Sequence, residues 1–401
     1  MSVFFTVVPV AEAVKAARSI GVPAGMELVP LCDSPGRILG QDIRSDIDIP
    51  GFTRSVVDGY AVRAADTSGS SDAVPAFLSL AGRVAMGADE ERAVTPGSCV
   101  YVPTGGILPA GADAVVMIEN AGTAGGDVMV RKPVAHGENV LLANEDFRKG
   151  EVVLRCGRKI SAQDTGVLAA AGCTSVPVSK KPRIAILSTG NELIPASGIP
   201  ARGQVRDVNS YVIASFVQGQ GCIPVRYGII RDDRAALGSA MKKAAAECDA
   251  VLISGGSSKD ERDMVAAVIG GEGEVLVHGV AIAPGKPTII GKFSGKPVIG
   301  LPGHPAAAVV VLVAIGSRLI ASMTGESESS IRTTGAVLAE NVPSTRGRED
   351  YVRVVVNDGI ATPLFGKSGL LNTLVRSTGL VRIPAESEGL ETGARVEVIL
   401  W

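Results

Sequence analysis

The chain of 401 residues is too long for one hydrophobic core, so about two to four domains are expected. Its hydrophobic fraction of 46% and charged fraction of 20% are those of an ordinary globular protein. The net charge of −2 argues against nucleic acid as a partner, so any anion binding must be local. No CxxC pair occurs among the six cysteines, which disfavours a zinc site and predicts reduced thiols in the cytoplasm.

Neither a leader sequence nor a membrane span is predicted. The first 19 residues lack a basic start and carry Glu12 within the apolar stretch, unlike a signal peptide. The longest apolar run, residues 306–316, is well short of the about 20 residues that cross a bilayer.

The first 178 residues predict a β module inserted into a more extended helical part. A helix is expected over residues 9–20, because Pro9 suits a first turn and Gly21 with Pro23 forms a stop. Short strand-like segments separated by turns then follow to about residue 150. We assign residues 45–138 to the inserted β domain and residues 1–44 and 139–178 to the extended helical and linker domain.

Residues 179–325 predict a doubly wound, mostly parallel sheet covered by helices on both faces. Three stretches each read as a buried strand, a glycine-rich loop and a helix: RIAILSTGNEL, DAVLISGGSSKDERDM and KPVIGLPGHPAAAVVVLVAIG. Such loops point backbone N–H groups outward at the carboxyl end of a strand, where they can cradle a phosphate. Three of them predict that the strand ends share one cleft.

Carboxylates lie in or just beyond two of these loops: Glu192, Asp260, Glu261 and Asp263. Phosphate cradles beside carboxylates predict a phosphorylated ligand held together with a divalent metal. Residues 326–401 return to short strands after a polar linker, which predicts a small β barrel or sandwich. The expected fold class is therefore α/β plus β, in several domains.

Six segments occur in the order found in one protein family. They are SVVDGYAV from Ser55, PTGGILPAGADAVVMIEN from Pro103, STGNEL from Ser188, GGSS with Asp263, PGKP from Pro284 and GLPGHP from Gly300. The chain resembles the molybdopterin molybdenumtransferases of the MoeA and gephyrin E-domain family over nearly its whole length.

This resemblance implies a molybdopterin-binding fold for residues 179–325 and transfer of molybdate, or tungstate, to adenylylated molybdopterin with release of AMP. It also implies Mg2+ as a helper and an elongated homodimer whose cleft lies between the α/β domain and β domains of both subunits. A molybdopterin adenylyltransferase is the implied source of the substrate.

The resemblance also assigns roles to individual residues. Catalytic roles are implied for Asp58, Asp146, Glu192, Asp232 and Asp263, the last three as Mg2+ ligands. Pterin and nucleotide contacts are implied for Thr104, Ser188, Thr189, Gly190, Gly255, Gly256, Ser257, Ser258, Lys286, Pro302 and Gly303. Molybdate binding is implied for Lys286, Arg346, Arg348 and Ser368, the last three set against the partner subunit's cleft.

A structural role stays open for many of these residues. Asp58 and Thr104 lie where turns are expected, and Asp146 is typical of a solvated loop. Glu192, Asp207 and Asp232 suit the start of a helix as capping residues, and Asp263 suits the helix dipole.

Five positions depart from the usual family pattern. Asn191 stands where many members have aspartate, and Lys259-Asp260 where a small residue and glycine are common. Ala283 replaces a lysine, and His304 replaces an asparagine. His304 either bonds a ligand or caps the following helix.

Two other functions remain open at this stage. A molybdopterin adenylyltransferase shares the α/β fold but usually lacks the extra β domains, and it would transfer AMP from ATP. A non-catalytic scaffold would bind the pterin without turnover. The sequence does not separate molybdate from tungstate, because both are tetrahedral dianions of nearly equal size.

Overall fold

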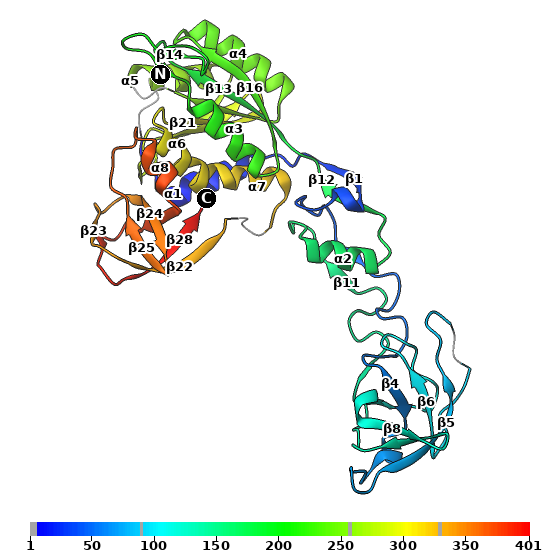
Figure 1. The fold of residues 1–401 in the computed structure, drawn as a ribbon. Coiled ribbons are helices and arrows are strands. Elements are labelled where there is room, and N and C mark those ends of the chain that lie inside the picture. Colours follow the sequence, from blue (N-terminus) through cyan, green and yellow to red (C-terminus); the bar gives the residue numbers. More distant parts are fainter. Residues whose placement is uncertain (1–5, 89–90, 256–258, 328–330) are drawn as a thin grey trace. The chain divides into compact units, whose positions relative to one another are not determined.

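The computed structural model describes residues 6–88, 91–255, 259–327 and 331–401, without the side chains of residues 259–263. The chain divides into two compact units, which are described in turn (Figure 1). The first comprises Met1–Gln41, Cys156–Ser161 and Ser175–Trp401, and the second Asp42–Arg155 and Ala162–Thr174. The four-domain division expected from the sequence stays a prediction.

The first unit is built on a six-stranded sheet of order β16-β13-β17-β21-β20-β18. The strands are β13 (Arg183–Thr189), β16 (Ile223–Ile230), β17 (Ala250–Ser254), β18 (Gly273–His278), β20 (Ile289–Phe293) and β21 (Lys296–Leu301). β16, β13, β17 and β21 run parallel, and β20 is antiparallel to both of its neighbours. The predicted mostly parallel sheet is confirmed.

Helices cover both faces of this sheet. One face packs with α1 (Val10–Ile20), α3 (Asn209–Gly219) and the continuous run α6 (Pro305–Val311), η4 (Leu312–Gly316) and α7 (Ser317–Thr324). The other face packs with α4 (Arg234–Glu247) and α5 (Lys259–Glu272). The doubly wound arrangement expected from the sequence is therefore confirmed.

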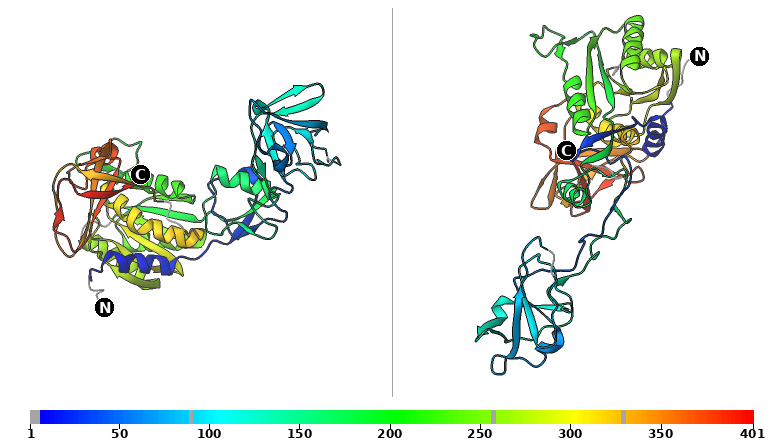
Figure 2. Two further views of the ribbon diagram at one scale, coloured as in Figure 1. Left: turned by 90° about the horizontal axis from the view of Figure 1, so that it is seen from below. Right: turned by 90° about the vertical axis from the view of Figure 1, so that its right-hand side faces the viewer.

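The first helix belongs to this core rather than to an extended arm. Val10, Ala13, Ala17 and Ile20 recur at helical spacing and are all buried. This apolar stripe packs against η4 and α7, and Figure 2 shows α1 beside that yellow helical run. The run Pro305–Thr324 is long and apolar enough to cross a membrane, with a mean hydropathy of 2.1, but 72% of it is buried inside the protein. Such burial favours a core helix.

In the first of the three predicted strand–loop–helix units, the helix does not follow the glycine-rich loop directly. After β13 the chain forms β14 (Leu193–Ile194), which pairs in parallel with β15 (Val205–Arg206), and α3 begins only at Asn209. Pro195 and Pro200 in the intervening segment explain the difference, since proline and the residue before it disfavour helix. The other two units are confirmed as β17 followed by α5 and β21 followed by α6.

The C-terminal strands close into a small barrel, as predicted. Each strand pairs with the next in the ring β24-β25-β22-β28-β26 and back to β24. These are β22 (Thr333–Leu338), β24 (Glu349–Asn357), β25 (Ile360–Pro363), β26 (Gly379–Ile383) and β28 (Arg395–Leu400). Smaller elements of the first unit are β1 (Met26–Pro30), β12 (Ser175–Ser179), β19 (Ile282–Ala283), β23 (Val342–Pro343), β27 (Gly389–Leu390) and α8 (Asn372–Arg376).

The second unit is mostly β, with a sheet of order β7-β4-β6-β5-β9-β8. Its strands are β4 (Gly59–Val62), β5 (Ala76–Arg83), β6 (Ser98–Val102), β7 (Ala114–Met117), β8 (Ala121–Ala124) and β9 (Asp127–Val130). Short pairs join β2 (Ile43–Arg44) to β11 (Val152–Leu154) and β3 (Arg54–Ser55) to β10 (Val140–Leu141), and α2 spans Ala162–Ala170.

Candidate active site

A short strand pairing brings the basic residues of the α/β part and of the barrel together. β19 runs parallel to β24, with Ile282 opposite Glu349 and Ala283 opposite Asp350. The Glu349 N–H also donates to the Ala281 carbonyl at 2.9 Å. The loop after β19 carries Lys286, and the turn before β24 carries two arginines. The pairing therefore fixes these cations beside one another.

These cations line a cavity of about 530 Å³. The predicted residues that line it are Lys286, Pro302, Gly303, Arg346, Arg348 and Ser368, together with His304. The family resemblance implies that the turn with Arg346 and Arg348 faces the cleft of the partner subunit. Within this chain, however, that turn shares a cavity with Lys286. We call this hollow the anion cavity, because its polar lining consists mainly of N–H and O–H donors.

The backbone around Lys286 is fixed by several contacts. The Lys286 carbonyl accepts hydrogen bonds from the N–H groups of Val280 (3.0 Å) and Thr288 (2.9 Å). The Thr288 hydroxyl donates to the Gly285 carbonyl at 2.7 Å. Gly285 has a φ of +137°, and a Cβ there would lie 2.7 Å from Val311. A loop held this way presents its lysine at little conformational cost to an anion.

Acidic neighbours orient both arginines. Arg348 Nε lies 2.9 Å from Asp350 Oδ1 in an ion pair, and Arg348 Nη2 donates to Asp350 Oδ2 at 3.4 Å. The other carboxylate oxygen accepts from the Ser344 hydroxyl at 2.7 Å. Arg346 forms a longer pair with Glu388, at 3.4 Å, and both side chains are largely exposed. The sequence analysis did not predict a role for Asp350. Its position two residues after Arg348, at the start of a strand, could have indicated that it pairs with that arginine.

A second cavity of about 690 Å³ lies at the carboxyl ends of β13 and β17. The predicted residues Thr189, Glu192, Gly255 and Gly303 line it, and we call it the Glu192 cavity. Gly255 has a φ of +141°, and a Cβ there would lie 2.1 Å from Thr189 Oγ1. Glycine is therefore required where these two loops meet. Gly303 and His304 line both cavities, so they form the wall that the two share.

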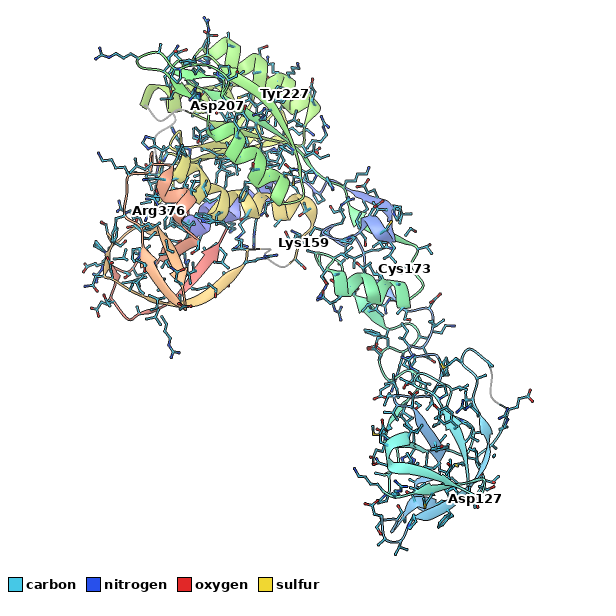
Figure 3. All side chains as sticks on the ribbon, in the orientation of Figure 1. Asp127, Lys159, Cys173, Asp207, Tyr227 and Arg376 are labelled. Carbon is cyan, nitrogen blue, oxygen red and sulfur yellow. The ribbon has the colours of Figure 1, made fainter. Side chains whose placement is uncertain are left out.

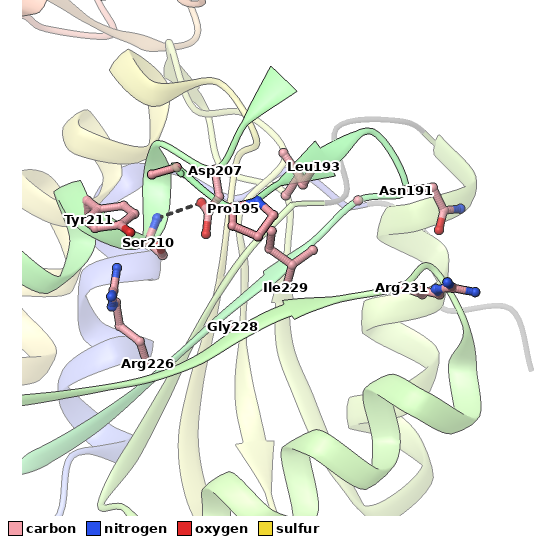
Figure 4. A pocket seen from close by; sticks show the side chains of 12 residues that line it. Asn191, Leu193, Pro195, Asp207, Ser210, Tyr211, Arg226, Gly228, Ile229 and Arg231 are labelled. Atoms are coloured by element: carbon pink, nitrogen blue, oxygen red, sulfur yellow. Dashed lines mark hydrogen bonds between the residues drawn. The ribbon is translucent and has the colours of Figure 1, made fainter. Parts of the chain in front are cut away.

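Ser188 lies below this surface. It is fully buried, and its hydroxyl donates to the Asp207 carboxylate at 3.0 Å. Asp207, labelled in Figure 3, also accepts from the Ser210 N–H at 3.1 Å at the start of α3, and Figure 4 shows this bond. This contact supports the capping interpretation of Asp207.

A third cavity, of about 680 Å³, lies on the other side of Asp207 (Figure 4). Gly190 and Asn191 line it, and the Arg226 guanidinium lies 4.1 Å above the Tyr211 ring. The stacked pair is typical of a cation–π contact.

Asp232 and Asn191 hold two loops to one another. The Asp232 carboxylate accepts from the Asn191 N–H at 2.9 Å, and the Asn191 side-chain carbonyl accepts from the Asp232 N–H at 3.3 Å. The asparagine that departs from the family pattern therefore has a structural partner. Within the described residues, Asp232 does not line either the anion cavity or the Glu192 cavity.

The donor set for a divalent metal is only partly described. Among the described residues, no three histidine, cysteine, aspartate or glutamate side chains form a group that could hold a metal ion. Glu192 presents one carboxylate in its cavity, and Mg2+ commonly takes only one or two carboxylates, with waters and phosphates completing its shell. Residues 256–258, with Gly256, Ser257 and Ser258, and the side chains of Lys259, Asp260, Glu261 and Asp263 lie outside the described part of the chain.

Three predicted residues belong to the second unit. The Asp58 carboxylate accepts from the Thr104 N–H (2.7 Å) and from its hydroxyl (3.1 Å). The structure therefore brings Asp58 and Thr104 together in the way that the turn interpretation requires. Asp146 is exposed, and its N–H donates to the Ile49 carbonyl at 3.1 Å.

His304 does not cap the helix that follows it. It occupies the N-cap position of α6, but its side chain makes no bond to that helix. Instead, Nδ1 lies 2.8 Å from the hydroxyl oxygen of Ser368. The capping alternative for His304 is therefore wrong.

The loop that carries Ser368 is held at two further points. The Ala306 N–H donates to the Ser368 carbonyl at 3.2 Å, and Arg353 Nη2 donates to the Gly366 carbonyl at 2.6 Å. Arg353 is buried, and this burial lowers the pKa of its guanidinium. Like Asp350, it was not a sequence candidate.

Comparison with known proteins bears on the whole chain. Residues 8–172 match the family described as "MoeA N-terminal region (domain I and II)", and residues 335–401 match "MoeA C-terminal region (domain IV)". Residues 185–321 match "Probable molybdopterin binding domain". The chain belongs to the MoeA family.

Individual relatives of this MoeA-family chain span its full length. It is 32% identical to a molybdopterin molybdenumtransferase of Bacillus subtilis, over 98% of this chain and 94% of that protein. It is 30% identical to molybdopterin molybdenumtransferase 2 of Mycobacterium tuberculosis, over 97% and 96%. A solved MoeA structure from Pyrococcus horikoshii superimposes with a TM-score of 0.86 at 33% identity, covering 99% and 100%. The resemblance expected from the six motifs is confirmed.

Proposed function

We propose that this chain is a molybdopterin molybdenumtransferase, which transfers molybdate to adenylylated molybdopterin and releases AMP. One observation carries the proposal. A cavity lined by Lys286, Arg346 and Arg348 shares its wall with a cavity lined by Glu192. An oxyanion and a phosphorylated ligand can therefore be held side by side. The relatives with this printed name match nearly the whole chain, which supports the assignment.

The anion cavity suits a tetrahedral dianion. Lys286 supplies a compact ammonium, and the arginines supply planar forks of N–H donors. Ser368 adds a hydroxyl that can donate to an oxygen of the bound anion. Because tungstate has the same shape and charge as molybdate, we propose that either serves as substrate.

The Glu192 cavity suits the nucleotide and pterin phosphates. Thr189, Gly255 and Gly303, at the carboxyl ends of β13, β17 and β21, line this cavity, and glycine-rich loops at such strand ends favour an anion. We propose that Glu192 and Asp263 hold Mg2+, which would neutralise charge on the phosphates as the phosphoanhydride is cleaved. Asp232 then keeps the Asn191 loop in place rather than touching the metal.

The remaining parts of the proposal rest on the family resemblance. We propose a cytoplasmic homodimer that receives its substrate from a molybdopterin adenylyltransferase. Asp58, Thr104 and Asp146 would act on the substrate as parts of that dimer. Sedimentation velocity of the full chain tests the dimer, and a purely monomeric species would contradict it.

The experiment that tests the function uses purified adenylylated molybdopterin. With molybdate, the chain is expected to release AMP and to yield a cofactor that activates a molybdenum-free apo-enzyme. Asp263→Ala is expected to lower turnover by orders of magnitude while the protein stays folded. AMP transfer from ATP to molybdopterin would favour the adenylyltransferase instead, and tight pterin binding without AMP release would favour the scaffold.

A further inference from the structure

His304 is the residue of the shared wall whose contact the proposed function does not yet use. Its Nδ1 lies 2.8 Å from Ser368 Oγ, and Ser368 lines the anion cavity. A serine hydroxyl has only one proton to donate. The direction of this one hydrogen bond therefore decides what Ser368 can offer to an anion.

Two arrangements of the pair are possible. When Nδ1 accepts, the Ser368 proton points to the imidazole, and the hydroxyl presents lone pairs to the anion cavity. When Nδ1 carries a proton and donates, the Ser368 proton is free to bond an oxygen of the anion. Only the second arrangement is attractive to a dianion, because a lone pair facing an oxyanion is repulsive.

We propose that His304 is a positioning residue that switches the Ser368 hydroxyl into its anion-donating direction, so that oxyanion capture depends on the protonation of the His304 Nδ1 atom. The inference rests on the proposed function for the identity of the anion as molybdate or tungstate. It makes capture of the oxyanion stronger at acidic than at alkaline pH, because the imidazolium always donates from Nδ1, whereas the neutral ring donates there only in its Nδ1–H tautomer.

The backbone around the pair is fixed on both sides, so that the side chains stay in register. The Ala306 N–H holds the Ser368 carbonyl, and Arg353 holds the loop at Gly366. On the other side, the Asn209 side chain donates to the Gly303 carbonyl at 2.8 Å. The proton on Nδ1 is thus the variable part of an otherwise fixed contact.

Other charged groups also face this wall. They are Lys286, Arg346 and Arg348 from the anion cavity and Glu192, Arg206 and Asp207 from the Glu192 cavity. All six are unchanged in a variant of residue 304. A difference in pH profile between such a variant and the natural chain therefore isolates the histidine.

Asparagine is the matched substitution. Its amide can donate to Ser368 without depending on pH. We therefore expect His304→Asn to keep anion binding but to lose its dependence on pH. Ser368→Ala removes the switched donor, and His136→Asn removes an exposed histidine of the second unit as a control.

The test is calorimetric titration of the full chain with sodium molybdate, and separately with tungstate, from pH 5.5 to 8.5. We expect the natural chain and His136→Asn to bind about tenfold more tightly at the acidic end, and His304→Asn to vary less than about twofold. Ser368→Ala should bind about tenfold more weakly than the natural chain at pH 5.5. Equal pH profiles for the natural chain and His304→Asn would overturn the inference, as would undetectable binding to the natural chain.

A second measurement uses only the natural chain, so it does not depend on whether a variant folds. Imidazole 15N NMR of the natural chain reports which ring nitrogen carries the proton. Addition of molybdate should move the His304 signals toward a protonated Nδ1, and no movement would overturn the inference. Neither measurement needs the pterin, so the outcome for the switch can be distinguished from the outcome for the proposed function. If the chain releases AMP but its molybdate affinity does not depend on the protonation of His304, the proposed function is supported and the switch is refuted.

Discussion

The side chain of Asn209 bonds the Gly303 carbonyl at 2.8 Å and the Ser254 hydroxyl at 2.7 Å. A single amide at the start of α3 thus links the ends of β17 and β21, two of the three strands whose ends or loops line the Glu192 cavity. Asn209 is buried, and within the described residues its Oδ1 has no hydrogen-bond partner although the residue lines that cavity. An N–H or O–H of the bound substrate is the expected partner.

Asn209→Ala should therefore weaken both stability and substrate binding. The buried Ser254 hydroxyl and the partly buried Gly303 carbonyl lose their donor, which is expected to cost roughly 1–3 kcal/mol of unfolding free energy. The KM for adenylylated molybdopterin should rise more than the KM for molybdate, because Asn209 lines only the former's cavity. Urea unfolding and steady-state kinetics measure the two effects. Equal changes in both KM values would contradict the inference that adenylylated molybdopterin binds in the Glu192 cavity and molybdate in the anion cavity.

Gly255→Ala tests the close approach of two loops. The new Cβ would lie 2.1 Å from Thr189 Oγ1 and 2.4 Å from the Thr189 carbonyl oxygen, at a φ of +141°. We expect a loss of more than about 2 kcal/mol of unfolding free energy and a large loss of AMP release. Gly203→Ala is the control, since Gly203 also has a positive φ but no atom within 4 Å of the added Cβ. Similar losses in both variants would mean that backbone strain alone, not the clash, is responsible.

Arg353→Met tests the anchor of the Ser368 loop. Methionine is similar in length to arginine but uncharged, so the substitution also removes the cost of burying a cation. The unfolding free energy should therefore change by no more than about 2 kcal/mol in either direction. The Gly366 carbonyl loses its donor, however, and the loop becomes less ordered. Molybdate affinity is expected to fall about tenfold, measured by calorimetry. Exposed Arg395→Met serves as control, and unchanged affinity in Arg353→Met would refute the anchoring role.

Because two thiols are buried, we expect the free energy of unfolding to fall at alkaline pH. Burial, followed by a nearby aspartate, raises the pKa of Cys99 and of Cys222 from 9.0 to about 12. As pH rises above 9 the unfolded chain loses these protons first, so stability that is complete below pH 9 declines toward pH 12. Each thiol should cost up to about 1.4 kcal/mol per pH unit in this range.

Urea unfolding at pH 7.5 and pH 10 measures the decline. Cys99→Ala should reduce the difference between the two pH values, whereas Cys32→Ser, at an exposed position, should leave it unchanged. A difference that is the same in all three proteins would show that these thiols do not contribute.

The sequence predicted the layers of the fold because its signals are local. Continuous apolar strands and helix stops are read from neighbouring residues, and they placed the parallel sheet and the barrel correctly. The parallel pair of β14 and β15 was missed because a glycine after a buried strand is equally typical of a strand-to-helix turn. Pro195 and Pro200 carried the opposing signal.

The partners of the site residues depended on distant contacts and were not predictable in the same way. Motifs nominated Lys286, Arg346 and Ser368, but their common cavity follows from the pairing of β19 with β24, which is only two residues long. His304 could be read as a cap or as a ligand until its contact with Ser368, 64 residues away, was seen.

The most direct test of the account compares Lys286→Ala with the natural chain in molybdate-dependent release of AMP from adenylylated molybdopterin. The natural chain should release AMP and form active cofactor. The variant should need at least about tenfold more molybdate for half-maximal rate, since a charged donor is lost from the anion cavity. A natural chain that binds the pterin but releases no AMP, or a variant with an unchanged requirement for molybdate, would contradict it.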